Sequence, residues 1–564
     1  MPSIPHLQKN DVSHQLIVNG KPFLMLAGEL QNSSLTSAEY MKEVWPKMVD
    51  THVNTVLGCV TWEDIEPEEG KFDFKNLDQI VLDARAHGIH LVLLWFGSFK
   101  NGISTYAPGW VKTNPKRFPR AKLRKAGGEL RTGDVVSIFH DEAPKADARA
   151  FGKLLEHIKE IDEAHSTVVM VQVENETGLL GDSRDGSKYA NERFAQPVPQ
   201  ELVDFIETSW DSLTDDFRAN FKTFRTASRK QGSWEEVFGK SKKTDELFMA
   251  YHYAHYLNRV AAAGKEKYPI PLYTNVWQNY AGDDADNNFP TIVGGGDEPG
   301  NYPSGGGVVD VLDIWQKEEK HSALTPRADV YLNEYASSCA KYRHRNQPLF
   351  IPEQRRDEYG ARRVWKAFGS HQCLGTSPFG IDTLEPATNP FTRHYGLLQR
   401  TRALVLEAQR RPGASFGFFF DELPADGSGA RDPSPPQKVV FGQWELSIER
   451  CFVFGKPGPG AGMVIHRGGN RFLLVGWGFQ VVARSLSPRS SFTGFLRFQE
   501  KVVADEETGE LRTLRNLNGD ETRSGIFAMM PNEDPDYGGF PICVTIPART
   551  MVAELEVYSI EEEE

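Results

Sequence analysis

The segment Val168-Val-Met-Val-Gln-Val-Glu-Asn-Glu-Thr-Gly178 holds the clearest structural signal in this chain. It opens with a nearly continuous apolar run, too short for a solitary helix and typical of a strand buried on both faces of a helix-covered parallel sheet. Glu174, Asn175 and Glu176 follow directly. Because barrel enzymes carry catalytic groups at the C-terminal ends of their strands, we expect part of an active site here. A solvated strand-to-loop turn is the alternative.

Strand-like and helical segments alternate on both sides of this segment. The eight strands, each but the last followed by helical material, extend over roughly 380 residues and predict a (β/α)8 TIM barrel with long βα loops. A doubly wound sheet would need a Gly-rich phosphate loop after the first strand, which Ala27-Gly-Glu-Leu30 is not. The predicted strands are Phe23–Gly28, Val53–Val60, His90–Phe96, the run from Val168, Ile270–Trp277, Asp329–Leu332, Leu349–Glu353 and Gly375–Ile381.

The two ends of the chain differ from this alternation. Asn19-Gly20, between apolar runs, predicts a β-hairpin before the barrel. After about residue 400, short alternating runs separated by turn residues predict an all-β, sandwich-like domain, and Asp426–Pro436 is a Pro-rich connector. We therefore expect a barrel domain with its hairpin over residues 1–400 and a C-terminal β domain over residues 401–564, without a catalytic acid of its own.

The composition excludes several classes of protein. A net charge of −13 argues against a nucleic-acid or anionic-membrane partner, because such a surface releases no counterions from either. No apolar run has the length of a signal peptide or a membrane span. The five cysteines are few, scattered and odd in number, so we expect no disulfide framework and a cytoplasmic location. A homo-oligomer is compatible with the sequence.

Two predicted strands end in a carboxylate beside an amide. Glu174-Asn175-Glu176 follows the fourth strand, and Glu353-Gln354 closes the seventh. In a closed barrel these ends face each other across the mouth. Two carboxyl groups across a sugar-sized gap are what glycoside hydrolysis requires, one protonated to assist the leaving oxygen and one ionised to meet the anomeric carbon. Each acid alone could equally be a salt-bridged loop residue, so the pairing carries the hypothesis.

The chain resembles glycoside hydrolase family 35, the β-galactosidases, among the retaining barrel glycosidases. The resemblance covers about residues 15–385 and rests on motifs that occur in order: Phe23–Glu29, Asn54–Val56, Trp62–Phe74, Val171–Gly178 and Pro348–Glu353. It implies that Glu176 is the general acid/base, that Glu353 is the nucleophile and that Asn175 binds the sugar 2-hydroxyl. Glu174 points the other way along the strand and is expected to be structural.

The sequence also departs from that family. Central members carry a Tyr near the position of Cys59, a Cys-Ala-Glu-Trp-like run where this chain has Leu94–Asn101, and an aromatic residue where it has Gln354. These departures indicate a divergent subgroup with a different C-terminal β domain, and they weaken the prediction of galactose more than that of catalysis.

Further residues near the predicted strand ends are candidates for sugar contacts. Aromatic rings can stack on a sugar face or pack in the barrel core, and polar groups can bind hydroxyls. The candidates are Trp62, Trp95, Trp277 and Tyr331, which could also orient the nucleophile, together with Glu29 and Asn275. His252 and His255 have helical spacing, but no carboxylate motif accompanies them, so packing is favoured over metal binding. We expect neither a metal nor a cofactor.

These observations predict a retaining exo-β-glycosidase, most simply a β-galactosidase acting on an oligosaccharide or glycoside. Two alternatives stay open. The same machinery could act on another β-sugar, such as glucose or glucosamine, or transfer the sugar to an acceptor. The chain could also be a carbohydrate-binding barrel without catalysis, although the presence of both Glu176 and Glu353 counts against this.

Overall fold

The structure, a computed structural model, describes residues 4–11, 13–227, 230–280, 296–317, 324–423, 434–451, 458–517, 519–531 and 549–562. Most of the predicted connector Asp426–Pro436 lies outside the described residues. By their packing the residues form two compact units. The first comprises Met1–Gln8, Leu16–Gln354 and Ser377–Glu385, and the second Lys9–Gln15, Arg355–Thr376 and Pro386–Glu564.

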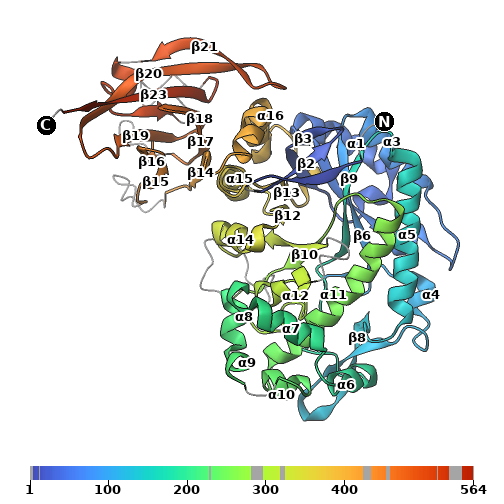
Figure 1. Ribbon diagram of the computed structural model, residues 1–564. Helices are drawn as coiled ribbons and strands as arrows, with labels where there is room; N and C mark the ends of the chain where they lie inside the picture. Colours follow the sequence, from blue (N-terminus) through green and yellow to red (C-terminus); the bar gives the residue numbers. More distant parts are fainter. Residues whose placement is uncertain are drawn as a thin grey trace. The chain divides into compact units, whose positions relative to one another are not determined.

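A closed barrel of eight strands lies at the centre of the first unit (Figure 1). Its strands follow one another around the barrel in sequence order, and the registers that link neighbours are parallel. The predicted (β/α)8 fold is therefore confirmed, with the segment from Val168 as the fourth strand and the one ending near Glu353 as the seventh. The strands are β4 (Met25–Glu29), β5 (Thr55–Thr61), β6 (His90–Lys100), β9 (Val168–Asn175), β10 (Leu272–Trp277), β11 (Thr325–Val330), β12 (Ile351–Gln354) and β13 (Gly375–Pro378).

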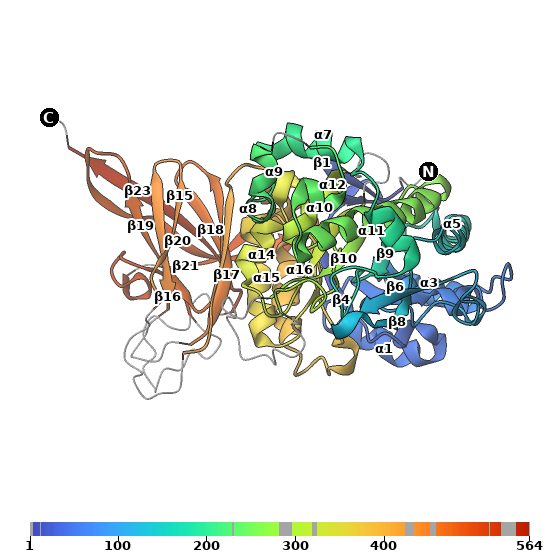
Figure 2. The same cartoon turned by 90° about the horizontal axis from the view of Figure 1, so that it is seen from below.

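Helices cover the barrel because its strands are apolar on both faces. Every residue of β5 and of β9 is buried. On α5 (Glu142–Asp162) the buried residues Phe151, Leu154, Leu155 and Ile158 recur at helical spacing, so one face of the helix packs inward. The long α11 (Lys242–Lys267) packs beside α5, as Figures 1 and 2 show. The other helices of this unit are α1 (Ala38–Asp50), α2 (Trp62–Ile65), α3 (Lys75–Ala86), α4 (Gly109–Lys112), α6 (Lys188–Phe194), α7 (Gln200–Ser209), α8 (Asp215–Asn220), α9 (Lys222–Thr226), α10 (Trp234–Phe238), α12 (Leu312–Lys317) and α14 (Tyr335–Lys341).

The predicted hairpin precedes the barrel. β2 (His14–Val18) and β3 (Lys21–Phe23) pair antiparallel, with β1 (His6–Lys9) as the third strand of the small sheet. Asn19 and Gly20 both have positive φ, at 51° and 78°. A two-residue turn with positive φ at both positions matches the twist of the flanking strands, which is why Asn-Gly marks such hairpins.

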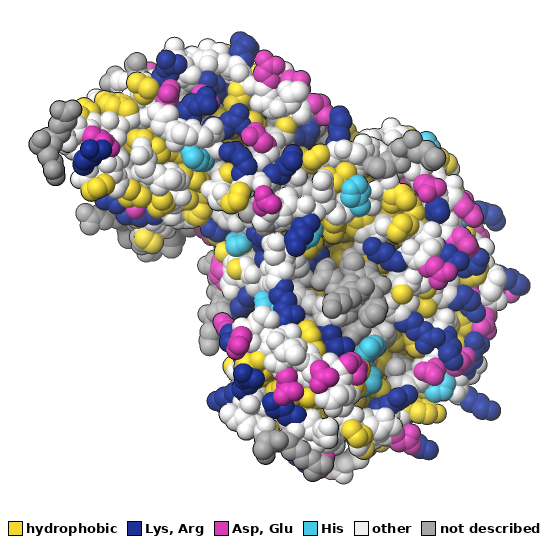
Figure 3. Space-filling model, in the orientation of Figure 1, with side chains coloured by type: hydrophobic (Ala, Val, Ile, Leu, Met, Phe, Trp, Pro, Cys, Tyr) yellow, Lys and Arg dark blue, Asp and Glu magenta, His cyan; other side chains and the backbone are white. Residues whose placement is uncertain are grey.

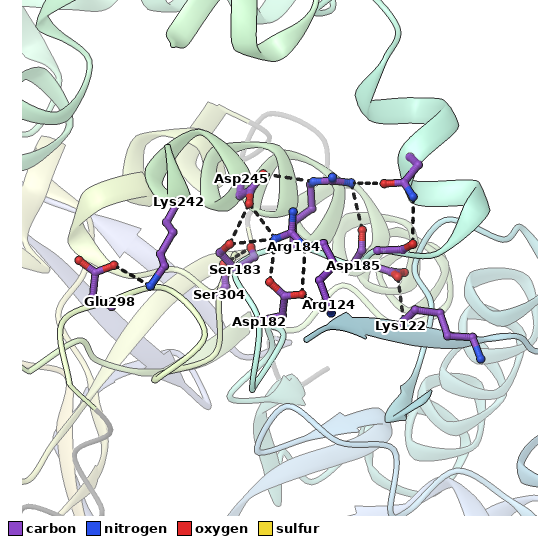
Figure 4. A network of polar contacts seen from close by, with 12 residues as sticks. Lys122, Arg124, Asp182, Ser183, Arg184, Asp185, Lys242, Asp245, Glu298 and Ser304 are labelled. Atoms are coloured by element: carbon purple, nitrogen blue, oxygen red, sulfur yellow. Dashed lines mark hydrogen bonds and ion pairs between the residues drawn. The ribbon is translucent and has the colours of Figure 1, made fainter. Parts of the chain in front are cut away.

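A polar network anchors the long loop that follows β9 (Figure 4). Arg124, on β7 (Arg120–Arg124), binds both carboxylate oxygens of Asp182 at 3.0 and 2.7 Å and reaches Asp245 of α11 at 2.8 Å. Arg184 donates to the other oxygen of Asp245 at 3.1 Å. The antiparallel hairpin of β7 and β8 (Leu130–Val136) is thereby tied to the loop that starts at the end of the fourth barrel strand.

The sixth barrel strand differs in position from its prediction. The sequence predicts Asp329–Leu332, whereas β11 comprises Thr325–Val330. Pro326 and Arg327 interrupt the apolar pattern, so the beginning of the strand was not visible in the sequence. Both residues are nevertheless buried in the sheet, Arg327 at 3% exposure. The shift moves Asp329 from the start of the strand to its C-terminal end.

The second unit contains two antiparallel sheets that share one core. Buried side chains from both sheets form a single hydrophobic cluster, so the predicted sandwich-like domain is confirmed. One sheet has the order β14 (Ser415–Phe420), β17 (Gly460–Gly468), β18 (Arg471–Trp477), β23 (Val552–Glu561), β20 (Ser490–Asp505) and β21 (Glu510–Leu517). The other has the order β15 (Gln437–Phe441), β16 (Trp444–Arg450), β19 (Phe479–Ser485) and β22 (Ala528–Met530).

The second unit also contains two helices that begin before residue 401. α15 (Glu358–His371) packs on β14 and β17, and α16 (Pro390–Gln409) contacts α15. Prediction of the sandwich missed β14, β16, β21 and β22. The alternating runs that predicted this domain lie on six other strands: Val439–Phe441, Gly462–Ile465, Arg471–Gly476, Gln480–Ala483, Gly494–Phe498 and Met551–Val557. The pattern of β16 could have revealed it, because Trp444, Leu446 and Ile448 are buried in alternation. The division of the chain at residue 400 stays a prediction.

The cysteines, the polarity of the helices and the surface charge are further features of the described residues. Cys59, Cys339, Cys373 and Cys451 are buried, and Cys543 lies outside the described residues. Among the described helices, none combines the length and apolar character that crossing a membrane requires. On the face shown in Figure 3, basic and acidic side chains are interspersed.

Candidate active site

Polar side chains gather where the barrel strands end. Six of them come from the C-terminal end of a strand or the residue after it, which is the position expected for the active site of a barrel enzyme. They are Glu29 of β4, Lys100 of β6, Glu176 after β9, Asn275 of β10, Asp329 of β11 and Glu353 of β12.

Three carboxyl groups converge at this end of the barrel. One carboxylate oxygen each of Glu176, Asp329 and Glu353 lies within 4.8 Å of the other two. Glu176 and Asp329 are 8% and 4% exposed, and Glu353 is half-buried. The two acids predicted from the sequence are thus brought together across the barrel, and Asp329 is added to them.

Asn275 links two of these acids. Its Oδ1 accepts a hydrogen bond from the backbone N–H of Glu176 at 2.8 Å, and its Nδ2 donates to Asp329 Oδ2 at 2.8 Å. Glu176 has a φ of 44°, an uncommon backbone conformation for a residue with a side chain. The bond from Asn275 holds this bend and so fixes the direction of the Glu176 side chain. Asn275 was predicted to contact sugar hydroxyls, and in this structure it orients the acid.

Tyr331 holds the predicted nucleophile. Its hydroxyl donates to Glu353 Oε1 at 2.5 Å. Tyr331 follows β11 directly, two residues after Asp329, so the end of one strand supplies both an acid and an orienting hydroxyl. The hydrogen bond suggested by the sequence is present.

Burial and neighbouring charges shift the pKa values of the acids in this site. Burial and, after it, the charge of Glu353 raise the pKa of Glu176 to about 7, against the opposing charge of Lys100. Burial and the charges of Glu353 and Glu176 hold the pKa values of Glu29 and Asp329 well above their usual range. A carboxyl group that stays protonated near neutral pH suits a general acid.

Lys100 is the cation of the cluster. Burial lowers its pKa, but the charges of Glu176, Glu353, Glu29 and Asp329 outweigh burial and raise it. Its Nζ lies 5.0 Å from the centre of the Phe96 ring. A permanently charged lysine among these acids stabilises whichever of them is ionised.

We expect the activity to fall as the pH rises through about 7. Glu176 must carry a proton to assist the leaving group, and the protonated fraction decreases above its pKa, which burial raises to about 7. The basic limb of a plot of kcat/KM against pH measures this pKa in the free enzyme. A limb that lies above pH 9 would show that another group is the acid.

Asn175 lies between two glutamates and has no partner for its side chain. It is fully buried, and neither Nδ2 nor Oδ1 has a hydrogen-bond partner among the described residues. Because unpaired buried amides are costly, such a group is expected to bind a ligand. Asp329 Oδ1 is likewise buried and without a hydrogen-bond partner in the described part of the chain.

Two of the predicted sugar contacts are not supported. Trp62 is fully buried, donates from Nε1 to Glu66 at 2.8 Å and packs against Trp110. Trp95 is also fully buried and donates to Asp147 of α5 at 2.9 Å, on the outer side of the barrel. Neither indole has an exposed face on which a sugar could stack, so both tryptophans have packing roles.

Trp277 fits its prediction better. It is the half-buried last residue of β10, two positions after Asn275. Alternate residues of a strand share a face, so Trp277 lies on the same side as the Asn275 side chain that contacts Glu176 and Asp329. It stays a prediction as a stacking surface.

Sequence reasoning missed Asp329 and Lys100. Asp329 was overlooked because the predicted strand began there instead of ending there. Lys100 closes an unusually long strand of 11 residues, four beyond the predicted end at Phe96. A lysine at the end of a buried strand was the available signal.

Metal binding finds weak support. Among the described residues, the oxygens of Glu176, Asp329 and Glu353 are the one group with metal-like spacing. Lys100, whose charge acts on all three, already provides a cation there. His252 packs against the rings of Phe139 and Phe248 at 4.9 and 4.7 Å.

Comparisons with known proteins bear on both parts of the chain. Residues 391–529 match a domain of unknown function, DUF5597. A β-galactosidase of Xanthomonas manihotis is 32% identical over 173 residues, which are 30% of this chain and 26% of that protein, so the chain matches about a quarter of the relative's length.

Solved structures with a similar fold have low identity to this chain. The catalytic domain of β-amylase from Paenibacillus polymyxa is 11% identical with a TM-score of 0.45, and the match covers 66% of this chain and 97% of that one. A β-galactosidase from Bacillus circulans sp. alkalophilus is 16% identical with a TM-score of 0.42, over 68% and 57% of the two chains. Neither likeness bears on function at this level.

A family model matches part of the barrel unit. Residues 32–238 match the family 42 glycoside hydrolase model described as β-galactosidase. The matched range contains β9 and Glu176 and ends before Glu353. The comparisons therefore do not support family 35 specifically. Over residues 32–238 this chain is therefore similar to the family 42 glycoside hydrolases, whose model is described as β-galactosidase.

Proposed function

We propose that this protein is a retaining exo-β-glycosidase, with β-galactosides as its first expected substrates. One observation carries the proposal: carboxylate oxygens of Glu176 and Glu353 lie within 4.8 Å of each other at the C-terminal end of the barrel. Retaining glycosidases hold their two carboxyl groups about 5–5.5 Å apart, whereas inverting enzymes separate them by about 6.5–9.5 Å to admit a water molecule.

The geometry supports a separate role for each acid. Glu353, oriented by Tyr331, attacks the anomeric carbon and forms the glycosyl-enzyme bond while the leaving oxygen departs. Glu176 gives its proton to that oxygen, and its raised pKa of about 7 keeps the proton available. Glu176 then takes a proton from water, which attacks the anomeric carbon and releases Glu353. Two inversions give net retention.

The unpaired polar atoms of the site supply groups for the sugar hydroxyls. The buried amide of Asn175 lies next to Glu176 in the chain, and Asp329 Oδ1 lies beside the acid pair, both without hydrogen-bond partners in the described structure. Binding a hydroxyl would satisfy each of them, so part of the affinity comes from removing a desolvation cost. Glu29 is a third hydroxyl-binding candidate.

A sugar with an ammonium group is the second candidate substrate. Glu29, Glu176, Asp329 and Glu353 outnumber the one described lysine that faces them, Lys100. Burial and, after it, the repulsion among these acids raise the pKa values of Glu29 and Asp329, and a ligand cation would relieve the repulsion. A terminal β-glucosaminide therefore belongs in the first substrate panel.

A panel of nitrophenyl glycosides tests the proposal. We expect release of nitrophenol from at least one β-glycoside and none from the matching α-glycosides. Proton NMR of the early product should show the β-anomer of the sugar before mutarotation. An α-anomer released from a β-glycoside would refute the retaining mechanism, and no turnover of any β-glycoside would favour a binding barrel. Added sugar acceptors distinguish transfer from hydrolysis, because transfer gives new glycosides in place of free sugar.

A further inference from the structure

The ladder between β6 and β9 breaks next to the active site. Regular pairing ends at Trp95 and resumes at Lys100, so residues 96–99 of β6 lie opposite Glu174 alone. A bulge of this size leaves backbone N–H groups without partners on the neighbouring strand. It also determines where Lys100, the residue after the bulge, meets the acids of the site.

The side chain of Glu174 replaces the missing ladder bonds. It is fully buried, and its Oε1 accepts from the backbone N–H of Ser98 at 3.1 Å while its Oε2 accepts from Phe99 at 2.7 Å. Backbone N–H groups this deep in a barrel need acceptors. The Glu174 side chain therefore links β9 to β6 by hydrogen bonds. Glu174 lies two residues before Glu176 on the same chain segment.

Asp147 completes the arrangement from α5. It is fully buried, and its Oδ1 accepts from Trp95 Nε1 at 2.9 Å. Its Oδ2 accepts from Ser98 N–H and from the Tyr256 hydroxyl, each at 3.2 Å. Glu174 and Asp147 thus share one N–H donor. Burial and the charge of Asp147 raise the pKa of Glu174 well above its usual range.

Gly97 shows how tightly the two carboxyl groups fill the bulge. A Cβ atom at this position would lie 2.6 Å from Glu174 Oε1 and 2.8 Å from Asp147 Oδ1. These separations are shorter than any ordinary carbon–oxygen contact. Only a residue without a side chain lets the backbone pass the acid pair.

We propose that Glu174 and Asp147 form a positioning clamp, in which two buried carboxyl groups fill the β6 bulge and hold Lys100 and Glu176 in place. Neither acid touches the substrate. The clamp acts through geometry: it fixes the strand that carries Lys100, and it fixes Glu174, whose φ of 59° begins the bend that leads to Glu176. The inference rests on the proposed function, because that function is what makes the positions of Lys100 and Glu176 important.

The charge of Lys100 gives the clamp a specific readout. Lys100 lowers the pKa of Glu176, so a clamp that lets Lys100 move away should raise this pKa and shift the basic limb to higher pH. Lys100→Met should shift the limb in the same direction. If Glu174 merely supported the fold, its replacement would lower activity and stability and would leave the basic limb of the pH profile unchanged.

The test compares variants of the full-length protein. We expect Glu174→Ala and Gly97→Ala to lower kcat by on the order of 10²-fold, the loss that a misplacement of about 1 Å can cause, and to move the basic limb upward. Glu174→Gln keeps an acceptor for the Phe99 N–H and a donor for Asp147, so it should restore most of the activity. In the Lys100→Met background, Glu174→Ala should produce no further shift of the limb.

Glu160→Gln is the matched control, because Glu160 is exposed on α5, the helix that carries Asp147. Its kcat and basic limb should equal those of the unmodified protein. Thermal melting identifies variants that fail to fold. If Glu174→Ala is one of them, Gly97→Ala and Asp147→Asn take its place in the test of the clamp. The proposed clamp is refuted if folded variants keep the basic limb at its original pH, or if Glu174→Gln loses as much activity as Glu174→Ala.

A measurement without turnover separates this inference from the proposed function. An NMR titration of the isotope-labelled Glu176 carboxyl carbon gives its pKa directly, and Glu174→Ala should raise that pKa. If the protein cleaves no β-glycoside, the proposed function fails, while the titration still supports or refutes the clamp. If it cleaves glycosides and the titration is unchanged by Glu174→Ala, the clamp alone fails.

Discussion

Replacing Glu353 with alanine is expected to lower kcat/KM by at least the ~10²–10⁴-fold loss typical of one positioned catalytic group. The half-buried Glu353 ends β12, and the Tyr331 hydroxyl donates to it at 2.5 Å. Its removal leaves no carboxylate in position to form the glycosyl-enzyme bond. Steady-state kinetics with an activated aryl β-glycoside measure the loss, and thermal melting shows that the barrel is folded.

Added azide makes this experiment specific. In Glu353→Ala the small anion can occupy the space of the lost carboxylate and attack from the same face, which gives an α-glycosyl azide by a single inversion. Glu192→Ala is the control, because the Glu192 side chain is 59% exposed on α6; it should retain full activity. Turnover by folded Glu353→Ala within ten-fold of the original rate would place the nucleophile elsewhere.

Replacing Glu176 with alanine should give a loss that depends on the leaving group. Glycosides with poor leaving groups need the proton and should lose about 10²–10⁴-fold in kcat/KM, whereas activated aryl glycosides should lose much less in the first step. The basic limb of the pH profile should disappear, because the group whose pKa burial raises to about 7 is gone. Kinetics with a series of aryl glycosides of graded leaving-group pKa measure both effects.

Azide again distinguishes the roles. With Glu176→Ala the glycosyl-enzyme still forms on Glu353, and azide attacks from the opposite face to give a β-glycosyl azide. The two variants thus give opposite anomers from one substrate. A basic limb that persists unchanged in Glu176→Ala, or an equal loss for all leaving groups, would assign the acid to another residue, with Asp329 the next candidate because it lies within the same group of oxygens.

The order of the strands was predictable because the local periodicity of apolar residues in the sequence indicates it. The apolar run at β9, the Asn19-Gly20 turn and the alternation of strand and helix depend on residues close together in sequence. Counting strands was therefore enough to place Glu176 and Glu353 on the fourth and seventh, and a closed barrel brings those ends together. The sandwich-like domain was visible from alternation, although β14 and β16 were overlooked.

The rest of the site depended on information that periodicity does not contain. Asp329 entered the site because β11 begins four residues earlier than predicted, with Pro326 and Arg327 buried inside the sheet. Lys100 entered it because β6 bulges where Glu174 replaces the ladder bonds. The β6 bulge is filled by side chains of β9 and α5, which lie far away in sequence.

The sequence by itself determined the barrel, the sandwich and the two strands that carry the acid pair, because each follows from short-range patterns and from the topology they impose. The tertiary structure decided which side chains face the site. It buried Trp62 and Trp95, turned Asn275 toward Glu176, and brought Asp329 and Lys100 to the acids. The physical reason is that the direction of a side chain at the end of a strand depends on register, bulges and hydrogen bonds to distant residues, and these form only when the barrel closes.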